Sequence, residues 1–170
     1  PAPDAMVLDC GCGGGANIKT LLKLCPNGKV QGIDYSAVSV EKAQKVNARA
    51  IAAGRCTVQQ ASVAELPFEA EQFDVVTAFE TVYFWPELAQ NFREVYRVLK
   101  PGGVFFICNE ANGETTKDDK WTQIIDGMTI YTDTALKEYA PIILLDEATA
   151  GLDVENETAI QKALSRLIKK

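Results

Sequence analysis

The stretch "VLDCGCGGGAN", residues 7–17, joins a short apolar run to four glycines within five residues. An apolar run that stops at glycines is typical of a buried strand followed by a tight turn. The glycines let the main chain approach a ligand closely, and the helix expected at residues 16–24 offers N–H groups at its start. The stretch therefore predicts a strand, a ligand-binding loop and a helix in succession.

A phosphate-binding P-loop does not fit this stretch. That loop requires the pattern GxxxxGK[ST]. Lys19 and Thr20 supply its last two residues, but Ile18 stands where the second glycine must be. The pattern is therefore that of another kind of ligand loop.

A dinucleotide-binding loop fits the glycines better. Its pattern GxGxxG/A matches Gly11, Gly13 and Ala16. Asp34 ends the next expected strand, where such folds place an acid that holds a ribose. Asp9 opposes this interpretation, because a carboxylate beside a pyrophosphate repels it. The same carboxylate suits a ligand that carries an ammonium and a sulfonium group.

Six apolar runs alternate with helical patterns along the chain. This alternation predicts parallel strands with right-handed crossovers and helices on both faces of the sheet. We expect a single α/β domain over residues 1–170, with a three-layer, Rossmann-like, doubly wound and mostly parallel sheet of about six strands. Ser36 is the expected N-cap of the second helix, and Gly54 its end. Strands are expected at residues 5–9, 29–34, 56–61, 73–80, 103–110 and 142–146, and helices at residues 16–24, 37–53, 86–99, 132–140 and 160–167.

The composition excludes several classes of protein. The chain of 170 residues carries a net charge of −6, which argues against a nucleic-acid-binding surface. It contains no histidine, which excludes Ser-His-Asp and Cys-His catalysis. Its five cysteines form no CxxC pair, so we expect reduced thiols in the cytoplasm and no bound metal. No apolar run approaches the ~20 residues that span a bilayer, so no membrane partner is expected.

Four motifs together resemble class I S-adenosylmethionine (SAM)-dependent methyltransferases. They occur in the order and at the spacings of that family: "VLDCGCGGGAN", "GIDYS" from Gly32, "LPFEAEQFDVV" from Leu66 and "EVYRVLKPGG" from Glu94. The resemblance covers residues 5–139. It implies SAM as the cofactor and transfer of its methyl group to an unknown acceptor.

The resemblance also implies roles for individual residues. Ser62 stands where the family usually has an aspartate at the adenine edge, which weakens adenine recognition but leaves a hydroxyl for hydrogen bonding. Glu80 ends the fourth expected strand beside the methyl position and is the catalytic candidate. The cofactor-binding candidates, from the methionine to the adenine end of SAM, are Asp9 for the ammonium, Gly11, Gly13 and Gly15 for the close-approach turn, Asp34 for the ribose, Tyr35 beside the adenine ring, and Ser62 and Val63 for its edge.

The acceptor side is less defined by the sequence. Such enzymes generally carry helices before the first strand and an antiparallel last strand, and this chain starts four residues before its first expected strand. We therefore expect methyl transfer to be impaired, and the alternative is a chain that retains no catalysis. Polar and aromatic candidates for the acceptor side are Glu80, Tyr83, Trp85, Asn109 and Trp121.

The stretch "PIILLDEATAGLDVENE", residues 141–157, resembles a different family. It is similar to the Walker B strand and D-loop of ABC-transporter ATPases, and the resemblance extends over residues 140–170. Asp146 and Glu147 would match the magnesium-binding acid and the hydrolytic base, but the chain has no Walker A loop, so ATP hydrolysis is not expected. The two resemblances together imply a recombined or engineered chimera, whose last strand completes the sheet. An exposed sheet edge or a swapped C-terminal helix then favours a homodimer.

Overall fold

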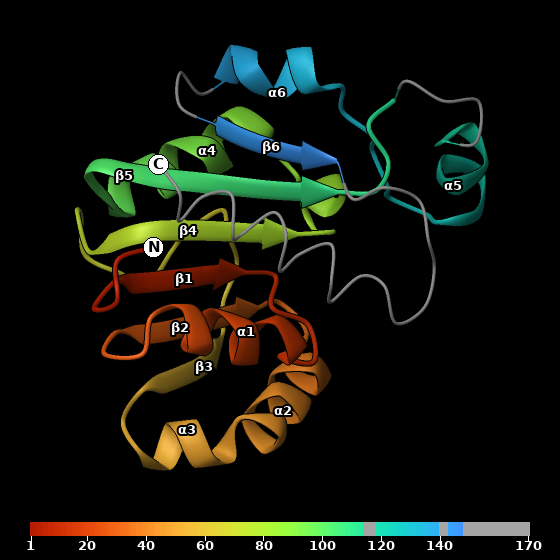
Figure 1. Ribbon diagram of the computed structural model, residues 1–170. Coiled ribbons are helices and arrows are strands. Elements are labelled where there is room, and N and C mark those ends of the chain that lie inside the picture. Colours follow the sequence, from red (N-terminus) through yellow and green to blue (C-terminus); the bar gives the residue numbers. More distant parts are fainter. Residues whose placement is uncertain (114–117, 140–142, 148–170) are drawn as a thin grey trace.

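A parallel sheet forms the centre of the protein, with the strand order β3-β2-β1-β4-β5-β6 (Figure 1). The structure is a computed structural model, and it describes residues 1–113, 118–139 and 143–147. The chain fills one half of the sheet outward from β1 and then returns to fill the other half, so the order reverses between β1 and β4. Ligands of open α/β sheets bind at such a switch point. The strands are β1 (Met6–Cys10), β2 (Lys29–Asp34), β3 (Cys56–Gln60), β4 (Phe73–Phe79), β5 (Leu99–Asn109) and β6 (Ile143–Glu147).

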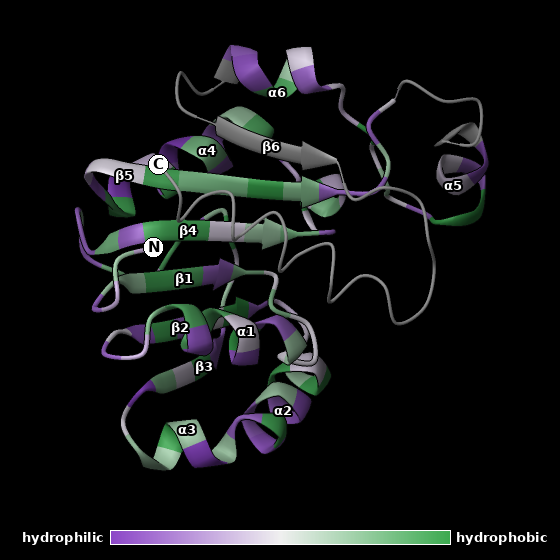
Figure 2. Cartoon of the chain, viewed as in Figure 1, coloured by the Kyte–Doolittle hydropathy of each residue, from purple (hydrophilic) through white to green (hydrophobic). Residues whose placement is uncertain are grey.

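Helices cover both faces of the sheet, which confirms the predicted three layers. Ile18 and Val40, from the first two helices, belong to one apolar core, whereas Phe92 and Leu136 belong to another. Figure 2 shows the hydrophobic colour concentrated in the central strands between these helices. The helices are α1 (Ala16–Leu24), α2 (Ala37–Val46), α3 (Ala48–Ala52), α4 (Leu88–Val98), α5 (Asp118–Ile124) and α6 (Asp133–Tyr139), with the short 3-10 helix η1 (Val82–Phe84).

The central strands are mostly apolar because each of their faces meets a core. The exceptions are Asp9 in β1 and Asp74 and Thr77 in β4. In β1, Val7 points into the core under α1 and α2, and Leu8 into the core under α4. Val75 and Val76 divide β4 in the same way. Successive side chains of a strand point to opposite faces, so a strand between two helical layers needs a nearly continuous apolar run.

The helix predicted at residues 37–53 is interrupted, and that prediction was wrong in this detail. Ser36 caps its start as predicted, since its Oγ accepts a hydrogen bond from the N–H of Ser39. Asn47 separates α2 from α3 and donates from Nδ2 to the carbonyl oxygens of Gly15, at 2.9 Å, and Ala43, at 3.0 Å. The break ties the glycine loop to α2, and Val46 is exposed rather than turned inward.

The boundaries around β4 and α4 also differ from the prediction. Helix α4 begins at Leu88 rather than Pro86, because its N-cap Glu87 is non-helical at φ −115° and ψ 83°. Leu99 was expected inside that helix, but it pairs with Phe73 and starts β5.

The sixth strand lies where the sequence predicts it. β6 pairs in parallel with β5, from Phe105 opposite Ile143 to Asn109 opposite Glu147. The expected helix at residues 160–167, and with it the helix of a swapped dimer, lies outside the described residues. Within the described ranges, no helix is long and apolar enough to cross a membrane.

Candidate functional site

A cleft of about 790 Å³ opens at the carboxyl ends of β1, β2 and β4, on the switch point of the sheet. Two residues predicted to bind the cofactor, Asp9 and Gly15, are not among those that line it. The structure brings the other predicted site residues together in its walls: Gly11, Gly13, Asp34, Tyr35, Ser62, Val63 and Glu80.

The three predicted loop glycines are required at their positions for different structural reasons. All have positive φ, at +72° for Gly11, +50° for Gly13 and +77° for Gly15, a region that disfavours other residues. A Cβ on Gly11 would overlap the side chain of Thr81, and one on Gly15 would collide with Asn47. A Cβ on Gly13 would meet no atom within 4 Å. Gly13 alone therefore opens its main chain to a ligand without packing against protein.

Asp34 joins the first two loops of the site. Its Oδ2 accepts a hydrogen bond of 2.8 Å from the N–H of Gly13, and its Oδ1 accepts one of 2.9 Å from the N–H of Ser36. The side chain is only 8% exposed. A carboxylate oxygen can accept more than one hydrogen bond, so both oxygens keep capacity for hydroxyl groups of a ligand.

Asp9 lies beneath the glycine loop. It is 1% exposed, and its Oδ1 accepts a hydrogen bond of 2.8 Å from the hydroxyl of Thr77. Its Oδ2 is buried and has no hydrogen-bond partner in the described structure. Burial raises the pKa of Asp9 to about 7; the Thr77 bond opposes this rise and the charge of Asp34 adds to it. The nearby Cys10 and Cys12 are buried free thiols.

The wall predicted to meet the adenine combines an exposed ring with a tight turn. Tyr35 is 78% exposed at the rim, where its ring is free to cover a ligand. Ser62 accepts a hydrogen bond of 3.2 Å at Oγ from the N–H of Ala64, so its own hydroxyl hydrogen is left to be donated. Val63 is buried against the core under α4 while also lining the cleft.

Glu80 stands just beyond β4 with an unusual main chain. Its φ is +54°, and its N–H donates to the carbonyl oxygen of Cys108 at 2.9 Å. Strained residues of this kind collect at functional sites. Although the residue is exposed, its carboxyl group is desolvated, which raises its pKa to about 7. Hydrogen bonds from Tyr83 and the Glu110 main chain oppose the rise, and the Glu110 charge adds to it.

Tyr83 links Glu80 to the loop after β5. Its hydroxyl lies 3.1 Å from Oε2 of Glu80 and 3.2 Å from the carbonyl oxygen of Ala111, and it accepts a 2.8 Å hydrogen bond from the N–H of Ala111. The ring is 3% exposed, and burial raises the pKa of the hydroxyl well above its usual value. Tyr83 is thus placed to orient Glu80 rather than to meet an acceptor directly.

The remaining acceptor-side candidates occupy three different places. Trp85 touches the cleft, but its ring stacks on Phe105 with centroids 5.9 Å apart, so it belongs mainly to the core. Asn109 is buried, and neither amide atom has a hydrogen-bond partner in the described structure. Trp121 lies on α5 and is not among the cleft residues.

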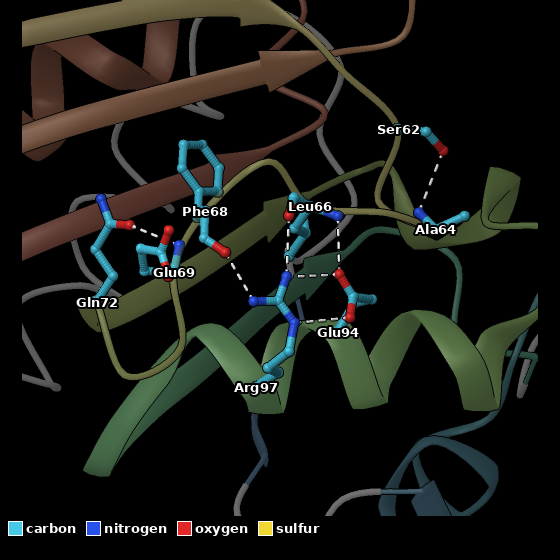
Figure 3. Close-up of polar contacts among 8 residues, drawn as sticks. All are labelled: Ser62, Ala64, Leu66, Phe68, Glu69, Gln72, Glu94 and Arg97. Carbon is cyan, nitrogen blue, oxygen red and sulfur yellow. Dashed lines mark hydrogen bonds and ion pairs between the residues drawn. The ribbon is translucent and has the colours of Figure 1, made fainter.

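Sequence reasoning missed two residues that form hydrogen bonds to the loop in the wall of the cleft. Arg97 and Glu94, on α4, form an ion pair of 2.8 Å and bind the main chain of the loop between β3 and β4 (Figure 3). Arg97 donates to the carbonyl oxygens of Leu66 and Phe68. The signal that could have indicated the ion pair is the spacing of opposite charges three residues apart on a helix. Nothing in the sequence identified carbonyl partners about thirty residues upstream.

The fold and site have the arrangement of a class of proteins: α/β domains that bind a nucleoside-containing cofactor between a glycine loop and an acid at the end of the second strand. Residues 8–107, more than half of the 170 residues, match the methyltransferase domain family. The chain belongs to that family. The predicted fold class and the predicted cofactor, SAM, are confirmed.

Relatives among characterised proteins act on dissimilar acceptors. Cycloartenol-C-24-methyltransferase 1 of Oryza sativa subsp. japonica is 31% identical over 105 residues, which is 62% of this chain and 30% of that protein. Demethylmenaquinone methyltransferase of Lactiplantibacillus plantarum is 38% identical over 112 residues, or 65% of this chain and 47% of that one. The chain thus spans less than half the length of these relatives.

Solved structures agree on the fold. The methyltransferase in complex with the Haloferax volcanii Trm112 activator superposes with a TM-score of 0.78 at 23% identity, covering 88% of this chain and 67% of that one. Geranyl diphosphate C-methyltransferase of Streptomyces coelicolor, solved with S-adenosyl-L-homocysteine (SAH), gives 0.69 at 19% identity, covering 81% and 50%. At these identities the similarities show the fold, and the ATPase resemblance of residues 140–170 stays a prediction.

Proposed function

We propose that the chain binds SAM in the cleft and transfers its methyl group to an acceptor. SAM supplies a methyl group that is already activated by its sulfonium, so the protein mainly aligns the two reactants and excludes water. The observation that carries the proposal is the arrangement of the glycine loop and Asp34 at the cleft. Gly13 turns an open main chain toward the cleft, and Asp34 ties that loop to the end of β2.

The charge of the cleft supports SAM over a dinucleotide. Besides Asp34, which a ribose of either ligand could use, its lining includes the carboxyl group of Glu80, and no lysine or arginine among the described residues that form it. A pyrophosphate is normally met by N–H groups without facing carboxylates, whereas a ligand with an ammonium and a sulfonium is attracted by acids. The residues present therefore fit SAM.

Each predicted site residue has a part in this proposal. The free acceptor capacity of Asp34 takes the ribose hydroxyls, Tyr35 covers the adenine ring, and Ser62 and Val63 meet its edge. Asp9 attracts the ammonium from beneath the loop, and Oδ2 is the oxygen left for it. Glu80, held by Tyr83, takes a proton from the acceptor.

Isothermal titration calorimetry with SAM and SAH tests the proposal. We expect saturable binding of both ligands by the wild-type chain and its loss in Asp34→Ala. Asp4→Ala is the matched control, because Asp4 is exposed and is not among the cleft residues. A folded wild-type chain that gives no heat and no thermal shift with either ligand would contradict the proposal.

A second candidate is a scaffold that retains no catalysis. It rests on the resemblance of residues 140–170 to an ABC-transporter ATPase segment, joined as a strand–loop–helix unit to a methyltransferase-like core at residues 1–139 in one domain. The pairing of β6 with β5 supports the docking of its strand.

The β3 and β6 strands lie at the edges of the described sheet, and we propose that such an edge forms the homodimer. A strictly monomeric mass by light scattering would contradict the dimer.

A further inference from the structure

The loop between β3 and β4 forms one wall of the cleft through Ala61, Ser62 and Val63. Its first end is attached to β2, since the N–H of Ala61 donates to the carbonyl oxygen of Asp34 at 3.0 Å. A tight turn follows, in which the N–H of Glu65 reaches the carbonyl oxygen of Ser62 at 3.3 Å. The turn closes on itself, so its position in the cleft depends on the attachment of Ala61, the packing of Val63 and what holds the residues after it.

Leu66, directly after that turn, is held at both main-chain groups by side chains from α4. Its N–H donates to Oε2 of Glu94 at 2.9 Å, and its carbonyl oxygen accepts from Nη2 of Arg97 at 2.9 Å. Arg97 also donates from Nη1 to the carbonyl oxygen of Phe68 at 2.7 Å (Figure 3). Loop main-chain groups have no ladder partners, so these side chains substitute for a neighbouring strand.

The two side chains hold each other in place. Nε and Nη2 of Arg97 both donate to Glu94, each at 2.8 Å. The planar guanidinium fits a carboxylate in this two-point manner, which fixes orientation as well as distance. The same hydrogen bonding lowers the pKa of Glu94 from its usual value, so its carboxylate stays ionised at neutral pH.

We propose that Glu94 and Arg97 are positioning residues for cofactor recognition: by fixing Leu66, they hold Ser62 and Val63 at the place where the adenine edge is recognised. This inference rests on the proposed function, because it requires the cleft to bind SAM. It assigns to α4, outside the cleft lining, control over which base the cleft accepts. Neither residue lines the cleft, so their effect reaches a ligand only through the loop.

Arg55 provides a matched control within the same chain. Like Arg97, it donates to main-chain carbonyl oxygens of a distant segment, here those of Leu22, Cys25 and Gly28. Its partners lie in the last turn of α1 and in the turn between α1 and β2, at the opposite end of the sheet from the cleft. Arg55→Gln therefore removes the same chemistry without touching the adenine wall.

The test compares two ligands in four proteins: wild type, Arg97→Gln, Glu94→Gln and Arg55→Gln. The ligands are SAH and S-inosylhomocysteine, which has oxygen in place of the adenine amino group, and Kd is measured by calorimetry. We expect Arg97→Gln to bind SAH about tenfold more weakly and to lose most of the preference for SAH. The reason is that a displaced Ser62 hydroxyl no longer distinguishes the two bases by hydrogen bonding. Glu94→Gln is a smaller change that keeps the fold. It should weaken SAH binding and reduce the preference for SAH, as Arg97→Gln does.

Arg55→Gln is expected to lose thermal stability while keeping the wild-type Kd ratio of the two ligands. Wild-type affinity and ratio in folded Arg97→Gln and Glu94→Gln would overturn the proposal, as would an equal loss of preference in Arg55→Gln. No SAH binding by the folded wild-type chain would instead overturn the proposed function, and this inference with it.

Discussion

The glycine loop after β1 and Glu80 after β4, which is held by the buried contact between Tyr83 and Ala111, line the same cleft but are built differently. In the loop, neighbouring glycines set the shape through their own main-chain angles, and Asp34 locks it. In the second region, the Tyr83 side chain contacts Glu80 and also the main chain of Ala111, which is 28 positions away in sequence. The main-chain turn of the first region is therefore set by its own glycines and then held by Asp34, 21 positions away, whereas the second region exists only once the sheet has formed.

Gly11→Ala should have the largest effect, because it breaks the main-chain turn of the first region. The new Cβ would overlap Thr81, and the φ of +72° disfavours alanine. Strain and overpacking together should lower the free energy of unfolding by about 4 kcal/mol. Urea denaturation followed by circular dichroism measures the change.

Gly13→Ala is the matched variant within the same loop. Its φ of +50° is also unfavourable, but its Cβ would meet nothing within 4 Å. We expect about 1 kcal/mol of destabilisation, with a loss of SAH binding larger than that fall in stability explains. Equal destabilisation by the two substitutions would show that packing against Thr81 does not distinguish these glycines.

Asp9→Asn should have the next largest effect, and it depends on pH. Burial raises the pKa of Asp9 from 3.8 to about 7, so the folded state binds the extra proton between these values. Its contribution to stability is complete below about pH 4 and is lost as the pH rises through 7. The stability of Asp9→Asn relative to wild type should therefore rise by on the order of 3 kcal/mol from pH 4 to pH 8.

Chemical denaturation at both pH values measures this difference, and Asp4→Asn is the exposed control. A difference that does not change with pH would mean that Asp9 is ionised throughout. Calorimetry with SAM at pH 6 in two buffers of different ionisation enthalpy sharpens the test. An ammonium near Asp9 lowers its pKa, so binding should release a proton.

The sequence predicted the features that depend on residue type at one position. Ser36 capping α2 and the glycine turn follow from local chemistry, and the six strands follow from apolar runs between two cores. The interruption at Asn47 was not predictable, because its cause is a hydrogen bond to Gly15, which is 32 residues away. The role of Arg97 was invisible for the same reason. Most of the site residues predicted from motif spacing do line the cleft, but the motifs did not show that Asp9 is buried beneath the loop.

Tyr83→Phe breaks the contact among Glu80, Tyr83 and Ala111 and should have a smaller effect on stability. It leaves the buried N–H of Ala111 without the hydroxyl that accepts its hydrogen bond. An unpaired buried donor costs about 2 kcal/mol of stability. The pKa of Glu80 should also rise further, because the Tyr83 bond lowers it. Urea denaturation and carboxyl NMR measure the two effects, and Tyr96→Phe, on an exposed ring, should change neither.

Glu80→Gln should have the smallest effect on stability, because Gln can still accept from Tyr83 and the residue is partly screened by solvent. Its value lies in the pH dependence. The pKa of Glu80 is raised from 4.5 to about 7, so its contribution to wild-type stability is present below pH 4.5 and lost as the pH rises through 7; the variant lacks this loss. Glu110→Gln should lower the wild-type midpoint, since the Glu110 charge raises that pKa. NMR titration of the Glu80 carboxyl carbon checks both, and a midpoint near 4.5 would remove the case for a proton acceptor poised near neutral pH.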